Sequence, residues 1–305
     1  MFFVSRRDRG IGGMSPVWKL RGAASLGLGL AIASAVLLRP AEVADPFTAS
    51  AEPQKQAAAS ANPRANTGRK PEGAFIVDLK AGFDEETQYL SDYSMDTDWI
   101  RIAYKPSNVR WSKDGMKLEL RKTAGKLPFA GAEFQRAGYY GFGRYEAIIK
   151  ASAEYGAVSS FFTFTDTMFG DPHDEIDFEF VGKAPRQVHL NYFHKGENKP
   201  VDIPLWFDTA MADHLYAFEW TPDGIKWFVD GHQVHEVTMK TSAFGIPTAS
   251  SKVIANIWAG TGAATGWTGE PRFQTASAEY RCMSHVPLGG QGKQCSDTFK
   301  APPKP

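Results

Sequence analysis

The stretch HDEIDFEFVG, residues 173–182, alternates acidic and apolar side chains at every second position. Successive side chains of a β-strand point to opposite faces of the sheet. The alternation therefore predicts a strand with Ile and Phe side chains in the core on one face. The opposite face carries three acids, which are Glu175, Asp177 and Glu179.

The same two-residue period recurs along most of the chain and predicts many short strands. Asp-Gly pairs, typical of tight hairpin turns, stand between or beside such runs. The runs include residues 98–104, 115–123, 143–151, 156–165, 187–193, 214–220, 224–239 and 252–260, and the Asp-Gly pairs are at 114–115, 223–224 and 230–231. We expect an all-β fold, a jelly-roll sandwich of two antiparallel sheets, in which a sheet that curves inward would form a cleft on its concave face.

The composition narrows the choice of partners. The chain has 305 residues with 34 basic and 34 acidic side chains, so its formal net charge is zero. This balance argues against nucleic acid and against electrostatic binding to a membrane surface. A hydrophobic content of 43% suits a large core. We expect a monomer, since no exposed apolar stripe or heptad pattern is evident.

The N-terminal part is typical of a targeting segment. Basic residues precede an apolar run at 22–38, which predicts a signal peptide or signal anchor within residues 1–40. Residues 41–70 are rich in Ala, Pro and Ser and predict a disordered linker before a domain at 71–305. We therefore expect export to the periplasm or the outside of the cell, with membrane contact only through an uncleaved anchor.

Two cysteines, Cys282 and Cys295, lie close together near the C-terminus. In an exported protein this spacing favours one short-loop disulfide that holds an irregular tail. Two separate buried thiols are the alternative.

Three interpretations of the acidic face compete. A solvated strand face would set like charges side by side with no basic residue in the segment to offset them. A Ca²⁺ site would usually draw its ligands from a folded-back loop. Side chains spaced along a straight strand cannot converge on one ion. Retaining glycoside hydrolysis uses two carboxyl groups about 5–5.5 Å apart. For that chemistry the strand must curve, and Asp177 would couple to both glutamates.

Aromatic side chains on neighbouring strands could stack against sugar rings. Packing within the core is the alternative for each of them. The candidates are Phe162, Phe164, Phe193, Trp258 and Trp267.

The segment DEIDFEFVGK resembles the Glu-x-Asp-x-Glu signature of glycoside hydrolase family 16, and most of the domain resembles the bacterial lichenases, the endo-β-1,3-1,4-glucanases. The stretches that carry this resemblance are GAEFQ, YYGFGRYEAIIKA, GAVSSFFTFT, VHLNYF, YAFEWTPDGIKWFVDG and IANIWAGTG, within residues 75–282. The resemblance implies a catalytic, concanavalin-like β-jelly roll with a substrate cleft on its concave face. It also implies that the enzyme acts by double displacement on a β-linked polysaccharide. No cofactor is required, and a structural Ca²⁺ is left open.

The resemblance also assigns roles to residues. It implies that Glu175 is the nucleophile, Glu179 the acid/base and Asp177 an auxiliary aspartate. Substrate contacts carry over to Glu133, Phe162, Asn191, Asn256 and Trp258.

Four positions depart from the lichenase pattern. Gln135 replaces an arginine, Phe164 and Phe193 replace tyrosines, and His173 replaces a tryptophan. His173 shares the face of the acids, where it could modulate their protonation or simply pack. Another linear β-glucan, or an exopolysaccharide made by the cell itself, is thus an alternative substrate.

Two other functions stay open beside hydrolysis. A transglycosylase would use the same covalent intermediate and pass it to a sugar hydroxyl. A non-catalytic carbohydrate-binding domain would be expected to lack one of the acids, and here all three are present.

Overall fold

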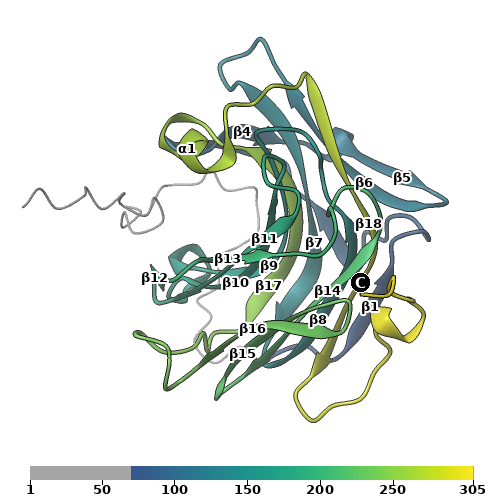
Figure 1. Ribbon diagram of the computed structural model, residues 1–305, viewed down its shortest axis with the longest axis vertical. Helices are drawn as coiled ribbons and strands as arrows, with labels where there is room; N and C mark the ends of the chain where they lie inside the picture. The colour runs from purple at the N-terminus through teal and green to yellow at the C-terminus, as the bar shows by residue number, and fades with distance from the viewer. Residues whose placement is uncertain (1–69, 305) are drawn as a thin grey trace, which may run out of the picture. The chain divides into compact units, whose positions relative to one another are not determined.

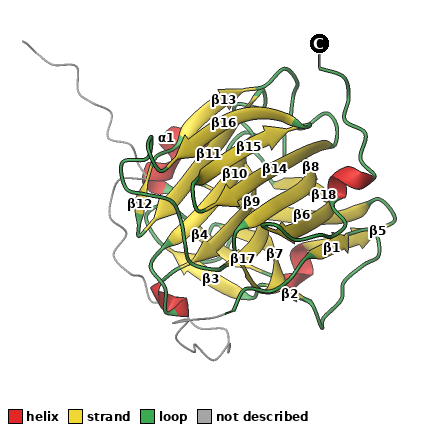
Figure 2. Cartoon of the chain, turned by 90° about the horizontal axis from the view of Figure 1, so that it is seen from below, coloured by secondary structure: helices red, strands yellow, loops and turns green. Residues whose placement is uncertain are grey.

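The computed structural model describes residues 70–304, and strands make up most of that range (Figure 2). The predicted signal segment and nearly all of the predicted linker lie outside the described residues. Within 70–304, no helix has the length and apolar character needed to cross a membrane. The short helices are η1 (Pro106–Asn108), η2 (Thr167–Phe169), η3 (Gly262–Ala264), α1 (Thr265–Thr268) and η4 (Cys295–Asp297).

One sheet, called the front sheet here, contains the acidic stretch. The strand that carries the acids is β10 (Asp174–Val181), which pairs with β11 on one side and with β9 on the other; the three labels lie close together in Figure 1. In spatial order the strands are β13 (Val201–Pro204) with β12 (Glu197–Asn198), β11 (Gln187–His194), β10, β9 (Ala157–Thr165), β17 (Ser251–Ala259), β7 (Phe129–Tyr140) and β2 (Gln88–Leu90).

The other sheet, called the back sheet, is joined to the front sheet through β7. The start of β7 pairs with β6 and β4, and its later part pairs with β17 and β2. The back sheet runs β16 (His232–Thr238), β15 (Gly224–Val229), β14 (His214–Thr221), β8 (Gly143–Lys150) and β18 (Thr275–Pro287). The other edge of β18 pairs with both β1 (Phe75–Asp78) and β6 (Gly115–Lys122), and β6 also pairs with β5 (Val109–Ser112). Beyond the start of β7 the sheet ends in β4 (Arg101–Tyr104) and β3 (Tyr93–Asp96). Among the described strands only β4 and β7 pair in parallel.

Large aromatic side chains fill the space between the sheets. The ring of Phe178 on β10 lies 5.6 Å from that of Tyr216 and 6.4 Å from that of Phe218, both on β14. All three are fully buried. Burial of each such side chain contributes roughly 1.5–3 kcal/mol. The apolar face of the acidic stretch therefore faces the core, as its period predicts, and the acids lie on the other face.

Asp-Gly pairs lie at the turns of two hairpins in the back sheet. Asp230 and Gly231, between β15 and β16, both have positive φ angles of 50° and 80°. That backbone favours Gly and Asp and matches the strand twist of a two-residue hairpin. The Asp-Gly pair at 223–224 also joins two strands, but without a positive φ angle.

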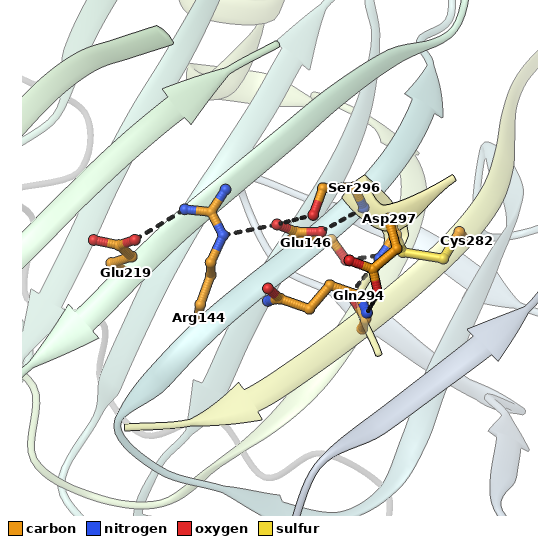
Figure 3. A network of polar contacts seen from close by, with 9 residues as sticks. Arg144, Glu146, Glu219, Cys282, Gln294, Ser296 and Asp297 are labelled. Carbon is orange, nitrogen blue, oxygen red and sulfur yellow. Dashed lines mark hydrogen bonds and ion pairs between the residues drawn. A yellow bond between two sulfur atoms is a disulfide. The ribbon is translucent and has the colours of Figure 1, made fainter. Parts of the chain in front are cut away.

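The C-terminal tail is fixed to the back sheet by a disulfide and a buried carboxylate (Figure 3). Cys282 and Cys295 are bonded, which confirms the predicted disulfide. Glu146 on β8 is fully buried and accepts hydrogen bonds from the Ser296 backbone N–H at 2.8 Å and from Arg144 Nε at 2.7 Å. These contacts satisfy the carboxylate and hold η4 against β8.

Candidate active site

The register of the front sheet arranges its outer face in rows across β11, β10 and β9. Side chains that are directly opposite on neighbouring antiparallel strands share a face and lie about 5 Å apart at Cβ. The rows are Phe193–Glu175–Phe164, Asn191–Asp177–Phe162 and His189–Glu179–Ser160. Four predicted site residues on β9 and β11 thus flank the acids, and one histidine that was not predicted joins them.

Asp177, the middle acid, lies deepest in this face. The residue is only 3% exposed, so the interpretation as a solvated face does not describe it. Burial first, and then the charges of Glu175 and Glu179, raise the pKa of Asp177 well above its usual range. A hydrogen bond to Glu175 acts in the same direction. The surroundings therefore favour the protonated form of Asp177, which can donate a hydrogen bond to Glu175.

Glu179 has a carboxyl pKa raised to about 7. Burial is the main cause; a positive charge on His189 lowers the pKa, and the charge of Glu175 raises it. A carboxyl group with this pKa is protonated in a good fraction of molecules near neutral pH, which a general acid requires.

His173 contacts Glu175 directly. Its Nε2 lies 2.5 Å from Oε2 of Glu175, and its ring stacks on Phe193 with centroids 4.3 Å apart. Burial lowers the pKa of His173, but the hydrogen bond and charge of Glu175, together with the charges of Asp166 and Asp174, outweigh it, so the pKa is raised. The imidazole therefore orients one oxygen of Glu175 and covers one side of it.

Glu133 on β7 is a buried carboxylate held by protein donors. It is 3% exposed and accepts hydrogen bonds from Ser91 Oγ at 2.7 Å, Gln135 Nε2 at 3.0 Å and Asn256 Nδ2 at 3.2 Å. Burial raises its pKa, although these hydrogen bonds act against the rise. Asn256 lies directly opposite Glu133 and continues the row of Glu179. Sugar binding there would have to share or replace these contacts.

The aromatic candidates fall into two groups. Phe164 and Phe193 are partly exposed beside Glu175, and Phe162 is 9% exposed beside Asp177. Trp258 packs with the core at 6% exposure, 5.9 Å from the ring of Trp267 on α1. The three phenylalanines are thus the candidates nearest to the acids.

His189 is the main candidate that sequence reasoning missed. It stands in the same period-two series as Asn191 and Phe193, which was the available signal. Its hydrogen-bond partner, Asp202 on β13, gives no such signal because the contact depends on how β13 pairs with β11. Tyr93 and Tyr104 also reach the Glu133 and Asn256 cluster from remote strands.

A metal centre finds no support among residues 70–304. No group of three or more His, Cys, Asp or Glu side chains in that range is placed to hold an ion. The chemistry of the acids needs no cofactor, since a carboxyl pair can supply both a nucleophile and a proton. The structural Ca²⁺ stays an untested prediction.

Comparisons with known proteins place the chain in one family of glycosyl hydrolases. A model of the family described as Glycosyl hydrolases family 16 matches residues 96–279. The chain is 36% identical over 228 residues to a β-glucanase of Acetivibrio thermocellus, covering 72% of this chain and 66% of that protein. It is 36% identical over 192 residues to a β-glucanase of Bacillus subtilis, covering 62% of this chain and 77% of that protein.

Solved structures share the fold. The β-glucanase of Bacillus licheniformis matches with a TM-score of 0.66 and 31% identity, covering 72% of this chain and all of that chain. A lichenase derived from a mouse hindgut metagenome matches with a TM-score of 0.66 and 30% identity, covering 71% of this chain and all of that one. The Crh5 transglycosylase matches with a TM-score of 0.59, covering 71% of this chain and 85% of that chain, and at 20% identity it shows the fold alone.

Proposed function

This chain belongs to glycosyl hydrolase family 16 and is a glycoside hydrolase, and on that premise we propose that it is an endo-acting, retaining β-glucanase. Its substrate is a β-1,3-1,4-glucan or a related β-linked polysaccharide. The observation that carries the proposal is the set of three carboxyl groups on one face of β10, where burial raises the pKa of Asp177 and that of Glu179.

In the first step Glu175 attacks the anomeric carbon of the sugar. The bond from that carbon to the glycosidic oxygen breaks, and Glu179 gives its proton to the leaving oxygen. Asp177, itself protonated, donates to Glu175 and keeps the attacking group oriented. A glycosyl ester on Glu175 results.

In the second step Glu179 is ionised and takes a proton from water. The water oxygen attacks the anomeric carbon, and the ester bond to Glu175 breaks. Two inversions restore the starting configuration and both carboxyl groups. A sugar hydroxyl in place of water would give transglycosylation by the same path.

The choice of substrate rests on the relatives. Curated relatives at 36% identity are called β-glucanases, and a structure at 30% identity is called a lichenase. Beside Glu175, however, His173 stacks on Phe193 and lies 5.4 Å from Phe164, and neither phenylalanine ring carries a hydroxyl. This apolar surrounding favours testing other β-glucans and an exopolysaccharide of the producing cell as well.

Where the enzyme acts follows from the N-terminal sequence. We propose an exported enzyme, periplasmic or extracellular, with residues 1–40 as its signal peptide or anchor. We also propose that it acts as a monomer. Membrane fractionation and light scattering of the purified chain would test these two points.

The test of the activity is release of reducing ends from barley mixed-linkage glucan, laminarin, xyloglucan and an acidic exopolysaccharide. We expect the mixed-linkage glucan to be cut into short oligosaccharides. The Glu175→Gln variant should lose at least about 1,000-fold in kcat because it has no nucleophile. Glu236→Gln, an exposed glutamate on β16, is the matched control and should keep full activity.

The products distinguish the alternatives. Acceptor oligosaccharides that become longer, with few new reducing ends, would show a transglycosylase. Binding to glucan with no bond cleavage by the unmodified chain would contradict the proposal and favour a carbohydrate-binding domain.

A further inference from the structure

A second row of titratable groups extends from Glu179 toward the edge of the front sheet. His189 on β11 lies directly opposite Glu179 on β10, and on its other side directly opposite Asp202 on β13. Partners in such positions share one sheet face. The imidazole is thus the middle member of a row of three ionisable side chains.

Two contacts fix the imidazole of His189. Its Nδ1 lies 2.8 Å from Oδ1 of Asp202, and its ring lies 4.8 Å from that of Trp267. The residue is only 6% exposed. The hydrogen bond to His189 lowers the pKa of Asp202, so this aspartate stays ionised. An ionised carboxylate beside Nδ1 favours the placing of a ring proton on that nitrogen.

We propose that His189, held by Asp202, is a positioning residue that sets the pH range in which Glu179 keeps its proton. The inference rests on the proposed role of Glu179 as the acid/base. It adds a group that neither the acidic signature nor the sugar-contact residues include.

The charges around Glu179 act in opposite directions. Glu175 on the same strand raises the pKa of Glu179, and a positive His189 lowers it. The pKa of Asp177 is raised well above its usual range by burial and by the two glutamates. Tyr104 on β4 is a buried phenol whose pKa is likewise raised well above its usual range, by burial and by Glu133 and Glu179. A positive charge on His189 therefore offsets part of the effect of burial on the pKa of Glu179.

The groups that face His189 are Glu179 on β10, Asp202 on β13 and the indole of Trp267 on α1. Lys183, in the turn after β10, acts on Asp202 and lowers its pKa further. Removal of the imidazole takes away a positive charge beside Glu179 and leaves its other neighbours in place. The pKa of Glu179 must then rise.

The experiment measures kcat against pH on mixed-linkage glucan for the full chain and its His189→Gln and Asp202→Asn variants. Loss of the proton on Glu179 gives the basic limb of the profile. We expect this limb to move up by roughly 0.5–1 pH unit in His189→Gln and by less, in the same direction, in Asp202→Asn. The control is His232→Gln, an exposed histidine on β16, and its limb should not move.

A second readout does not depend on activity. The carboxyl carbon of Glu179, labelled with ¹³C and assigned with Glu179→Gln, is titrated by NMR in the unmodified chain, in His189→Gln and in Asp202→Asn. An upward shift of its midpoint supports the inference. A midpoint within about 0.2 pH unit of the original in both variants overturns it.

The two proposals fail in different ways. An unmodified chain that cuts no polysaccharide contradicts the proposed hydrolase, while the NMR titration still tests the effect of His189 on Glu179. An active chain whose limb and midpoint stay fixed in His189→Gln contradicts only the inference. If His189→Gln does not fold, Asp202→Asn, which changes a half-exposed side chain, decides the point by the same criteria.

Discussion

Three carboxyl groups on one strand face have different surroundings, and these differences assign them different tasks. Asp177 is enclosed and lies between two acids, so it keeps a proton. Glu175 is oriented by His173 at 2.5 Å and is 17% exposed in its side chain. Glu179 has a pKa of about 7, set by burial and opposed by His189. Three acids at alternate positions of one strand thus differ in burial and in contacts because their neighbours differ.

At the scale of single residues, we expect Glu179→Gln to stabilise the folded protein in alkaline solution. The folded pKa of about 7 lies above the ordinary value of 4.5, so folding disfavours the ionised form. The resulting penalty is absent below about pH 4.5, grows as the pH rises, and is complete above about pH 7. The variant should therefore unfold with a free energy roughly 1–3 kcal/mol higher at pH 8 and with no difference at pH 4.

Urea unfolding at both pH values measures this effect. Glu236→Gln, which removes an exposed glutamate on β16, should show little change at either pH. Equal midpoints for Glu179→Gln and the unmodified chain at pH 8 would show that burial of this carboxyl group carries no such penalty.

At the scale of elements, β10 serves two surfaces at once. Its apolar face packs Phe178 against β14, and Trp227 on β15 donates a hydrogen bond of 3.3 Å to the carbonyl of Asp177. The aromatic packing and this hydrogen bond hold the backbone that carries the acids. The back sheet therefore supports the geometry of the site, although its own side chains lie behind it.

The C-terminal tail is a separate element with its own stability. Cys282 and Cys295 are 13 positions apart, and a loop of that size contributes about 2–3 kcal/mol when it is closed. We expect the double variant Cys282→Ser and Cys295→Ser to lose about that much free energy of unfolding. Its cleavage of glucan at 25 °C should stay near normal, because the acids lie on the other sheet.

Urea unfolding with and without reductant checks this expectation. The unmodified chain in reductant should behave like the double variant. A midpoint that does not move in either case would show that the Glu146 and Ser296 contacts alone hold the tail.

At the scale of the whole described domain, the sequence was sufficient for what depends on local order. The period of residues 173–182 correctly predicts which side chains face the core, and the Asp-Gly pairs correctly predict where strands turn. Glu133 and Asn256 are 123 positions apart in the chain, and their hydrogen bond depends on the register of β17 against β7. Such pairings follow from how the strands pack together, which no local pattern specifies.

The same limit explains why His189 was missed. Its position on the acidic face follows from the alternation in β11, but its importance comes from Asp202 and Trp267, which reach it from β13 and α1. When the sequence alone does not reveal the partner of a histidine, packing or a simple hydrogen bond explains that histidine equally well. Its surroundings become evident only when the sheet is assembled.

The central claim is that Glu175 forms a covalent bond to the sugar, and trapping that intermediate tests it most directly. The chain is incubated with a β-glucan oligosaccharide that carries 2-fluoro and dinitrophenyl groups, which slow breakdown of the intermediate and speed its formation. Mass spectrometry of the intact protein and of its peptides then locates the adduct. We predict that Glu175 gains the mass of one 2-fluoro oligosaccharide, after loss of the dinitrophenyl group. Hydrolysis of the compound with no adduct, or an adduct on Glu179 or Asp177, would contradict the mechanism.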